Sequence, residues 1–365
     1  MPIHQHTKAE VFHLKGKANL LKTPLRYPGG KSRACEKMSV FLPNLDIGSR
    51  YTQYREPFLG GGSFALHITK KFPHLEVWVN DLYEPLANFW QQLKVDGVEM
   101  RKRLVKIKNA NKTEEKAKEL FLKAKEDLYD KAATPLDRAV NFYIINKCSF
   151  SGLSESSSFS AQASKSNFSL AGIKRLDDYQ ELIKFWRITN KDYDELMYEG
   201  GDTFMYLDPP YDIKDNLYGK KGGMHKDFDH DKFAEACGKT CAHQLISYNS
   251  SMLVKNRFGS EYEAQEYDLT YTMRSTNDYK ENQKERKELL LFNYERGIIS
   301  QLKTRRNDAR ATDAKTDTFR HNTGYAGQIL KNTTQSKRNP KTGAFLDDQV
   351  DQENDGFTFI SSDVE

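Results

Sequence analysis

Cysteine is scarce in this chain, which has only four among 365 residues, at Cys35, Cys148, Cys237 and Cys241. So few cysteines do not build a disulfide framework, and we expect a reducing, cytoplasmic environment. Cys237 and Cys241, with His243 nearby, lack zinc-site spacing and a second ligand pair. We interpret them as two helix residues four apart on one face, and we expect no metal.

Long apolar runs are also missing. No stretch reaches the roughly 18 apolar residues of a membrane span, and the first residues, MPIHQHTKAE, are polar. We therefore expect neither a secretory signal nor a membrane partner. The net charge of +5 is compatible with a nucleic-acid partner but is weak support for one. The length suits one large domain with an insert, or two domains.

Neither a GxxxxGK[ST] phosphate loop nor a GxGxxG motif occurs. Instead, Gly60-Gly61-Gly62 follows a predicted strand from Thr52 to Phe58 and precedes a predicted helix from Ser63 to Lys70. Glycines at such a turn allow the backbone to approach a ligand closely. A second strand at Val77–Val79 completes a β-α-β pattern, which predicts a parallel sheet with helices on both faces.

Asp81 lies at the end of the second predicted strand. An acidic residue at that point can accept both ribose hydroxyls of an adenosine group. The alternative is an ordinary helix N-cap. The glycine turn and Asp81 together fit either a nicotinamide cofactor or S-adenosylmethionine.

Apolar residues at helical spacing predict helices around Leu86–Leu93, Ala117–Leu128 and Leu136–Ile144. Residues 149–169 show no such apolar spacing, and ten of these twenty-one residues are serine. This segment therefore predicts a long loop. The sheet pattern resumes at Phe204–Leu207.

Two more strands are predicted at Leu245–Tyr248 and Glu288–Phe292, and Asp229 is expected to cap the helix before the first of them. Residues 298–365 carry ten basic and ten acidic residues, mostly basic up to Lys341 and only acidic from Asp347. This segregation and the few apolar residues predict a tail of low order.

The tetrapeptide Asp208-Pro209-Pro210-Tyr211 follows the strand that ends at Leu207. The lone pair of adenine N6 is delocalised into the ring, so this amine is a poor nucleophile. The Asp208 carboxylate and the Pro209 carbonyl can accept its two N–H groups and free the lone pair. Pro209 and Pro210 stiffen the turn, and Tyr211 offers a ring on which an extruded base can stack. The motif favours S-adenosylmethionine and adenine-N6 methylation.

On four motifs the chain resembles the Dam-like adenine-N6 DNA methyltransferases, over roughly residues 22 to 295. They are Arg26-Tyr27-Pro28-Gly29-Gly30-Lys31, Glu56-Pro57-Phe58-Leu59-Gly60-Gly61-Gly62-Ser63, Asn80-Asp81 and Asp208-Pro209-Pro210-Tyr211. The resemblance implies that Tyr27, Lys31, Asp81 and Asp208 contact S-adenosylmethionine, together with Phe58, Gly60 and Gly62 of the glycine motif. Asp192-Tyr193 is similar to residues that flank the cofactor's adenine, and its alternative is an ordinary loop.

The resemblance also implies a Rossmann-like α/β methyltransferase sheet with an inserted, mainly helical target-recognition domain. We expect the catalytic domain at residues 1–87 and 186–297, the insert at 88–185, and the tail at 298–365.

The segment from Asn146 to Leu153 is similar to the start of the family's DNA-facing loop, although Lys147 and Ser151 stand where Arg and Asn are more frequent. Hydroxyls and basic side chains in this region suit contacts with phosphates and base edges. The residues expected to contact DNA are Asn146, Lys147, Ser151, Lys165, Lys174 and Arg175. The tail residues Arg305, Arg306 and Arg310 either lie on phosphates or are simply solvated.

The chain has no Pro-Cys pair, which excludes cytosine ring-carbon methylation because that reaction needs a cysteine nucleophile. Cytosine N4 enzymes usually carry Ser where this chain has Asp208. An RNA or protein-amide methyltransferase, which often carries Asn there and lacks a long insert, remains an alternative, as does a DNA-binding module that has lost catalysis. We expect a monomer that flips adenine out of duplex DNA without a covalent intermediate. Either a separate, cognate restriction endonuclease accompanies it, or the enzyme is solitary.

Overall fold

The computed structural model describes residues 23–27, 29–150, 152, 157–197, 200–211, 228–267 and 288–295. The chain divides into two units, Met1–Asp308 and Ala309–Glu365, and every described residue belongs to the first. The polar first residues, the tail at 298–365, the tail arginines and Ser151 all lie outside the described residues.

A seven-stranded sheet runs through the described part of the chain in the order β3-β2-β1-β4-β5-β7-β6. The first five strands, all mutually parallel, are β1 (Gln53–Glu56), β2 (Glu76–Asn80), β3 (Arg187–Thr189), β4 (Thr203–Leu207) and β5 (His243–Asn249). The parallel prediction is confirmed for them. It is wrong for β6 (Glu263–Tyr267) and β7 (Glu288–Phe292), which run antiparallel to their neighbours. A wholly buried strand such as β7 reads as a continuous apolar run, which carries no sign of its direction.

The strand order reverses between β1 and β4. From β1 the chain continues to β2 and β3 on one side, and from β4 it continues to β5 on the other. Connections that leave in opposite directions open a crevice at the carboxyl edge of a parallel sheet, and ligands bind there. The glycine turn follows β1, Asp81 follows β2 and Asp208 follows β4, so all three lie at this edge.

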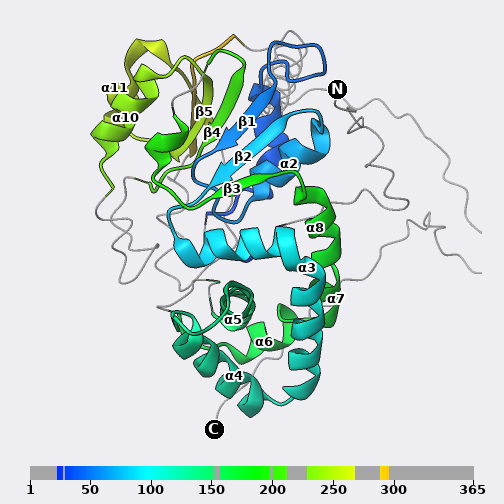
Figure 1. Ribbon diagram of the computed structural model, residues 1–365. Coiled ribbons are helices and arrows are strands. Elements are labelled where there is room, and N and C mark those ends of the chain that lie inside the picture. Colours follow the sequence, from blue (N-terminus) through cyan, green and yellow to red (C-terminus); the bar gives the residue numbers. More distant parts are fainter. Residues whose placement is uncertain are drawn as a thin grey trace, which may run out of the picture. The chain divides into compact units, whose positions relative to one another are not determined.

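Helices cover both faces of the sheet, as expected. In β4, Phe204 and Tyr206 belong to one hydrophobic cluster, which includes Phe64 of α2 (Ser63–Lys71), whereas Met205 and Leu207 belong to another. The second cluster includes buried residues of α10 (His230–Lys239) and α11 (Met252–Phe258). Figure 1 shows these two helices beside β5. Alternate side chains of a strand point to opposite faces, so β4 anchors two separate core layers.

Short elements complete this part of the chain. They are α1 (Cys35–Met38) and the 3-10 turns η2 (Ser39–Phe41), η3 (Tyr193–Leu196) and η5 (Gly259–Glu261). The predicted cap of α10 is confirmed, since the Asp229 carboxylate accepts from the backbone N–H groups of Asp231 and Lys232.

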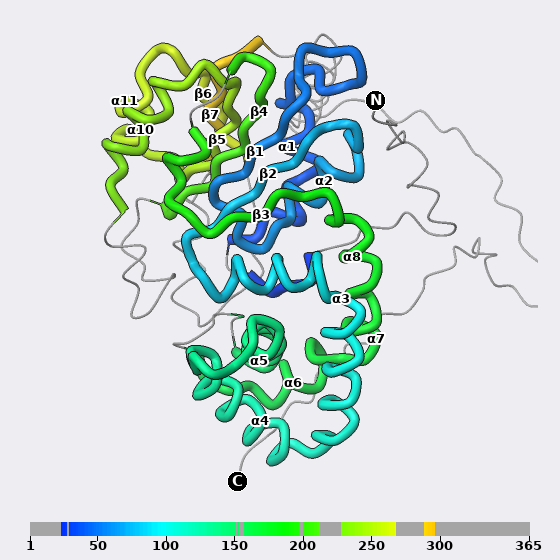
Figure 2. Tube along the Cα trace, viewed as in Figure 1, coloured from blue at the N-terminus to red at the C-terminus, as the bar shows by residue number. Residues whose placement is uncertain are grey.

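Six helices lie between β2 and β3 in the chain. They are α3 (Glu84–Ala110), α4 (Glu114–Asp127), α5 (Pro135–Cys148), α6 (Ala161–Ser166), α7 (Leu170–Lys174) and α8 (Leu176–Ile183). Figure 2 traces them as a group next to the sheet. The prediction of a structureless loop over 149–169 is wrong for α6. The Ser160 hydroxyl accepts from the Ala163 N–H and so starts this helix, because serine at an N-cap satisfies a backbone donor that the helix leaves open.

Helix α3 bends at Asp96, whose backbone is not helical. Gln180 of α8 compensates the broken helical hydrogen bonds. Its amide donates to the carbonyls of Lys94 and Val95 and accepts from the Val98 N–H. A side chain inserted into the hydrogen-bond ladder is a recognised cause of a helix kink. The bend therefore has a specific partner in α8.

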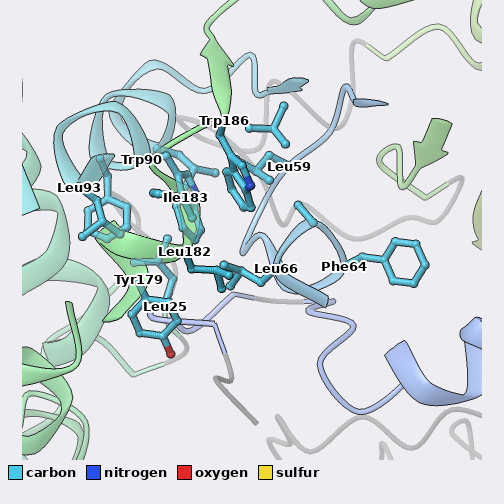
Figure 3. Packing of buried hydrophobic residues seen from close by; sticks show 14 of the residues in the cluster. Leu25, Leu59, Phe64, Leu66, Trp90, Leu93, Tyr179, Leu182, Ile183 and Trp186 are labelled. Carbon is cyan, nitrogen blue, oxygen red and sulfur yellow. The ribbon is translucent and has the colours of Figure 1, made fainter. Parts of the chain in front are cut away.

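The helices between β2 and β3 share a core with the sheet. The rings of Trp90 in α3 and Trp186 before β3 lie 5.8 Å apart, and Figure 3 shows them packed with Ile183 of α8. Trp186 also donates to the Thr69 hydroxyl of α2 at 2.8 Å. Each large aromatic side chain buried here contributes about 2–3 kcal/mol of hydrophobic stabilisation. No helix among the described residues is long and apolar enough to cross a membrane.

The interpretation of Cys237 and Cys241 as two residues on one helix face is wrong for Cys241. Helix α10 ends at Lys239, and Cys241 is exposed beyond that end, while Cys237 is buried. His243 forms a hydrogen bond with the Tyr51 hydroxyl. Within the described ranges, no group of three potential metal-binding His, Cys, Asp or Glu side chains is found.

Candidate active site

Lys31 and Asp208 form an ion pair at the carboxyl edge of the sheet. The Lys31 Nζ atom lies 2.9 Å from Asp208 Oδ1, and the lysine side chain is only 4% exposed. Lys31 also donates to the Tyr211 hydroxyl at 2.8 Å and to the Gly29 carbonyl at 3.2 Å. Lys31 of the N-terminal motif is thus in direct contact with Asp208 and Tyr211 of the predicted catalytic motif.

Tyr211 is held at both its hydroxyl and its ring. The hydroxyl donates to the carboxylate of Glu288, the first residue of β7, and the ring stacks on Tyr248 of β5 with centroids 5.9 Å apart. The sequence analysis did not identify Glu288 or Tyr248 as site residues. A signal for Glu288 existed, because it is an acidic residue at the start of the otherwise apolar strand ELLLF.

The Asp208 carboxyl has a raised pKa. Burial is the main cause, and the negative charge of Glu288 adds to it. The Lys31 ammonium and the Tyr211 hydroxyl oppose the shift. A carboxylate desolvated in this way is a stronger hydrogen-bond acceptor and base than one in water.

The three glycines after β1 make room for aromatic rings. A Cβ atom on Gly60 or Gly61 would lie 2.9 Å from Tyr27, and one on Gly62 would lie 2.7 Å from the Trp90 ring. Gly60 and Gly62 also have positive φ angles of 50° and 67°. Only glycine meets both demands without strain.

Asp81 fastens the glycine turn to the end of β2. Its carboxylate accepts from the Gly60 N–H at 2.8 Å and from the Tyr83 N–H at 3.0 Å, just before α3. Burial raises the pKa of Asp81 to about 6, although the two N–H groups act in the opposite direction. The helix-capping alternative is wrong, because the N-cap of α3 is Tyr83, without a side-chain cap. The two bonds leave a second lone pair on each carboxylate oxygen of Asp81.

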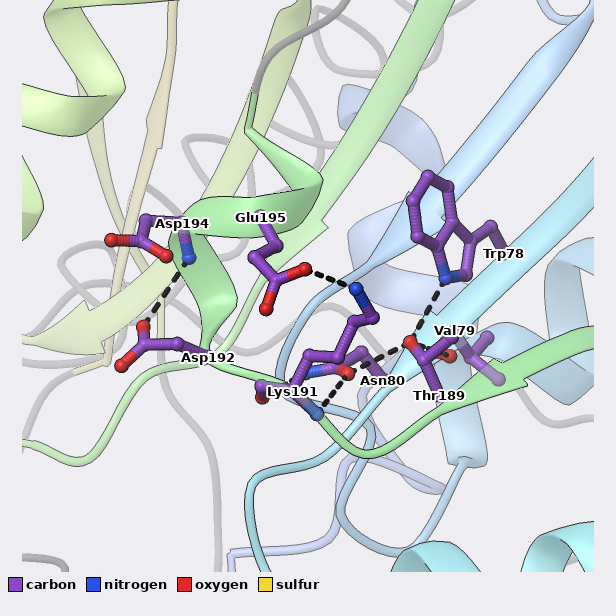
Figure 4. A network of polar contacts seen from close by, with 8 residues as sticks. All are labelled: Trp78, Val79, Asn80, Thr189, Lys191, Asp192, Asp194 and Glu195. Carbon is purple, nitrogen blue, oxygen red and sulfur yellow. Dashed lines mark hydrogen bonds and ion pairs between the residues drawn. The ribbon is translucent and has the colours of Figure 1, made fainter.

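Asn80 ties together the loops that follow three neighbouring strands. Its amide donates to the carbonyls of Pro57 and Lys191 and accepts from the Lys191 N–H and the Thr189 hydroxyl. Figure 4 shows the last two of these contacts. The buried asparagine thereby fixes the edge on which Asp81 stands.

Asp192 and Tyr193 lie on the next connection. The Asp192 carboxylate caps η3 by accepting from the Asp194 N–H (Figure 4). The Tyr193 ring stacks on Phe58 with centroids 5.3 Å apart. Phe58, which follows β1, and Tyr193 thus form an aromatic pair at the same edge as Asp81.

Glu56 is a further buried carboxylate, at the end of β1. It accepts from the Tyr54 hydroxyl. Burial raises its pKa well above the usual range, and the charges of Asp208 and Asp81 act in the same direction. Three acidic side chains therefore share this edge.

A comparison with protein families agrees with this arrangement. Residues 27–273 match the model of the D12 class N6 adenine-specific DNA methyltransferase family. The chain belongs to this family. It is an adenine-specific DNA methyltransferase with a Rossmann-like sheet, as the sequence motifs predicted.

A curated relative of this methyltransferase is the Type II methyltransferase M.MjaIII of Methanocaldococcus jannaschii. The two are 24% identical over 291 residues, which cover 75% of this chain and 99% of the relative. The similarity therefore extends over nearly the whole length of the relative.

Asn146 of the methyltransferase is buried rather than on the surface, where DNA would contact it. It is 1% exposed, and its side chain accepts from the Arg26 N–H and donates to the carbonyls of Arg26 and Gly152. Those three bonds satisfy the amide, so the structure gives Asn146 a role in joining the N-terminal motif to the loop after α5, rather than the expected DNA contact. Arg26 reinforces the junction by donating to the carbonyls of Ser149 and Phe150.

Lys147 lies close to Arg26 and Arg175. Its ammonium is 5.4 Å from the centre of the Tyr143 ring. The pKa of Lys147 is lowered to about 7, mainly by burial and also by the positive charges of Arg26 and Arg175. Arg175 and Lys174 are exposed near the end of α7. Lys147 thus lies close to Arg175, which follows Lys174 in the sequence, and all three are expected DNA contacts. Lys165, in contrast, lies on α6 and pairs with Glu114 at 3.4 Å.

Proposed function

We propose that this methyltransferase uses S-adenosylmethionine to methylate the N6 amine of an adenine flipped out of duplex DNA, without a covalent intermediate. The observation that carries the proposal is the Asp208 carboxylate at the end of β4, held by Lys31 at the edge that also bears the glycine turn. An acceptor fixed in this way is what a poorly nucleophilic amine requires.

The chemistry of the edge fits an adenosyl sulfonium. Asp81 keeps lone pairs for two ribose hydroxyls, and the Phe58–Tyr193 pair offers an aromatic surface for an adenine ring. When bound, S-adenosylmethionine supplies a methyl group on a positively charged sulfur, and nearby carboxylates favour that charge. The residues that would hold it are Tyr27, Lys31, Phe58, Gly60, Gly62, Asp81, Asp192, Tyr193 and Asp208.

The chain's own residues prepare the amine. Asp208 accepts one N–H of adenine N6 and the Pro209 carbonyl accepts the other, which frees the nitrogen lone pair. Pro209 and Pro210 stiffen the turn that presents these acceptors. Methylation leaves an extra proton on N6, and the raised pKa of Asp208 suits it to receive that proton.

Tyr211 stacks on the extruded base in this proposal. Its ring already packs on Tyr248 and its hydroxyl is held by Glu288, so its position is well defined before the base arrives. An enzyme that acts on a base within a duplex must first take it out of the stack.

We also propose that residues 88–185 form the target-recognition insert and that residues 1–87 with 186–297 form the catalytic domain. The position of α4 to α8 between β2 and β3 supports this division, although α3 itself continues across residue 88. The insert supplies Lys147, Lys174 and Arg175 for phosphates and base edges, with Lys165 available once it leaves Glu114. Ser151 is proposed as a further contact from the loop.

The cellular setting remains part of the proposal. A relative named as a Type II methyltransferase supports a separate restriction endonuclease with the same target. We propose that the enzyme acts as a monomer in the cytoplasm.

The test is transfer of a labelled methyl group from S-adenosylmethionine to duplex DNA, with tRNA as the alternative acceptor. We expect label in DNA as N6-methyladenine and none in tRNA. Asp208→Ala is expected to abolish transfer while the protein still folds and binds DNA. Transfer to tRNA, or near-normal turnover by Asp208→Ala, would contradict the proposal, and cofactor binding without any transfer would indicate a DNA-binding module.

A further inference from the structure

Glu288 lies at the centre of the site although it comes from a distant part of the chain. It opens β7, where it is paired in register with Asn249 of β5 and Tyr267 of β6, and it is only 4% exposed. Its carboxylate accepts from the Tyr211 hydroxyl, which itself accepts from Lys31. Lys31 in turn pairs with Asp208, so a continuous polar chain joins Glu288 to the proposed catalytic carboxylate.

A carboxylate at this position is costly for the fold. The other four residues of β7 are apolar and buried, and an apolar residue at 288 would suit the strand better. Burying a charged group destabilises a protein unless it is paired and hydrogen-bonded. Among the described residues, one partner of Glu288 is the tyrosine of the Asp208-Pro209-Pro210-Tyr211 motif, which connects its burial with the reaction.

We propose that Glu288 is a positioning residue for methyl transfer, which orients Tyr211 by hydrogen bonding and strengthens Asp208 as a base by its negative charge. The inference rests on the proposed role of Asp208. It adds a carboxylate that acts on the reaction through Tyr211 and through the electric field rather than by touching the substrate.

Two charges of opposite sign act on Asp208 in this arrangement. Lys31 lowers the pKa of Asp208, and Glu288 raises it. Among the described residues, the ionisable groups that face Asp208 from the surrounding elements are Lys31, Glu56, Tyr206, Tyr211, Tyr267 and Glu288. Without the negative charge of Glu288, the positive charge of Lys31 acts on Asp208 unopposed by it. The pKa of Asp208 then falls, and the carboxylate binds a proton less tightly.

The test compares Glu288→Gln with the wild-type full chain in single-turnover methylation of duplex DNA between pH 4.5 and 8. Asp208 must be ionised to accept an amine N–H, so its titration sets the acid limb of the profile. Glu288→Gln keeps an acceptor for Tyr211 but removes the charge. We expect its acid limb to move to lower pH by about one unit, and its rate on the plateau to fall about tenfold.

The matched control is Glu266→Gln, on the neighbouring strand β6. Glu266 is bonded to Ser250 and Lys255. Loss of its charge is expected to leave the acid limb unmoved. A merely structural role for Glu288 would lower the plateau or the melting temperature without moving the acid limb, and that result would overturn the inference.

Glu288→Asp separates charge from contact. If Glu288→Gln does not fold, Glu288→Asp tests positioning through a plateau that falls at an unchanged melting temperature, since a merely structural role would lower both. The shorter side chain keeps the charge but draws back from Tyr211. We expect a lower plateau with an unmoved acid limb, and a variant equal to wild type would count against positioning. Asp208→Ala shows whether the inference or the proposed function has failed. If Asp208→Ala is inactive and Glu288→Gln behaves like wild type, only the inference about Glu288 is rejected. If Asp208→Ala is active, the proposed function itself is rejected.

Discussion

The Lys31 ammonium lies 2.9 Å from the Asp208 carboxylate, although Lys31 precedes the first strand of the sheet and Asp208 follows the fourth. The pair joins the N-terminal motif to the proposed catalytic turn. Lys31 is buried, so this contact is shielded from solvent and salt more strongly than a surface ion pair. It fixes the direction of Asp208 and favours the ionised form of that half-buried carboxylate.

Lys31→Met is expected to slow methyl transfer about a hundredfold, because it removes a fixed charge from a desolvated site. Lys31 lowers the pKa of Asp208, so its loss raises that pKa and moves the acid limb of the rate profile to higher pH. This direction is opposite to the one expected for Glu288→Gln. The measurement is the single-turnover rate from pH 4.5 to 8. Lys70→Met, in the last turn of α2, serves as the control and should leave the profile unchanged. An acid limb that stays in place in Lys31→Met would argue against the electrostatic role.

Cofactor affinity is expected to depend on the ionisation of Asp81, whose pKa is raised to about 6. The ionised carboxylate accepts ribose hydroxyls better than the protonated form does. Binding should therefore weaken about tenfold from pH 7 to pH 5. Folding has the opposite dependence, because the folded state holds this proton more tightly than the unfolded chain and loses stability as pH rises from about 4 to 6. Calorimetric titration with S-adenosylmethionine measures the first effect. Asp81→Asn should bind weakly and without this pH dependence, and an unchanged dependence would assign it to another group.

Gly62→Ala is expected to destabilise the protein by about 3 kcal/mol, since it combines a left-handed backbone with overlap on the Trp90 ring. Gly48→Ala is a matched control. Gly48 also has a positive φ, of 84°, but an added Cβ atom there meets nothing within 4 Å. It should cost only the backbone strain, about 1 kcal/mol. Urea unfolding of both variants gives the difference, and equal losses would show that the Trp90 contact adjusts freely.

DNA affinity is expected to fall as pH rises above about 7 if Lys147 contacts a phosphate. In the free protein its pKa is lowered to about 7, and a nearby phosphate would raise it again. The favourable charge is thus fully present below pH 7 and is lost as pH rises through the higher pKa of the bound state. Lys147→Arg stays charged and should remove this pH dependence without loss of affinity. Fluorescence anisotropy with a labelled duplex from pH 6.5 to 9 provides the measurement, and identical slopes for the two proteins would place Lys147 away from the DNA.

Methyl transfer is expected to proceed unchanged in EDTA. The proposed step needs an acceptor for the amine N–H and a base for its proton, and Asp208 supplies both without a Lewis acid. The rate should be the same with EDTA, with added Mg²⁺ and with neither. A loss in EDTA that Mg²⁺ restores would require a different mechanism.

The sequence alone determined the beginning and end of most elements near the site. The strand predicted before Gly60 corresponds to β1, although its polar residues Arg55 and Glu56 are buried too. The apolar run before Asp208 predicted β4, which is wholly buried. The four motifs also indicated the family and the reaction, since the chemistry of a poor nucleophile limits which residues serve at such a turn.

Only the tertiary structure decided which residues meet. Glu288 comes from a strand whose sequence predicts burial but neither direction nor neighbours, and its contact with Tyr211 depends on the insertion of β7 between β5 and β6. Asn146 was expected to contact DNA, yet it is buried and its side chain is hydrogen-bonded to Arg26 and Gly152. Periodicity records whether a side chain is buried along its own element, whereas these contacts depend on how elements far apart in the chain pack together.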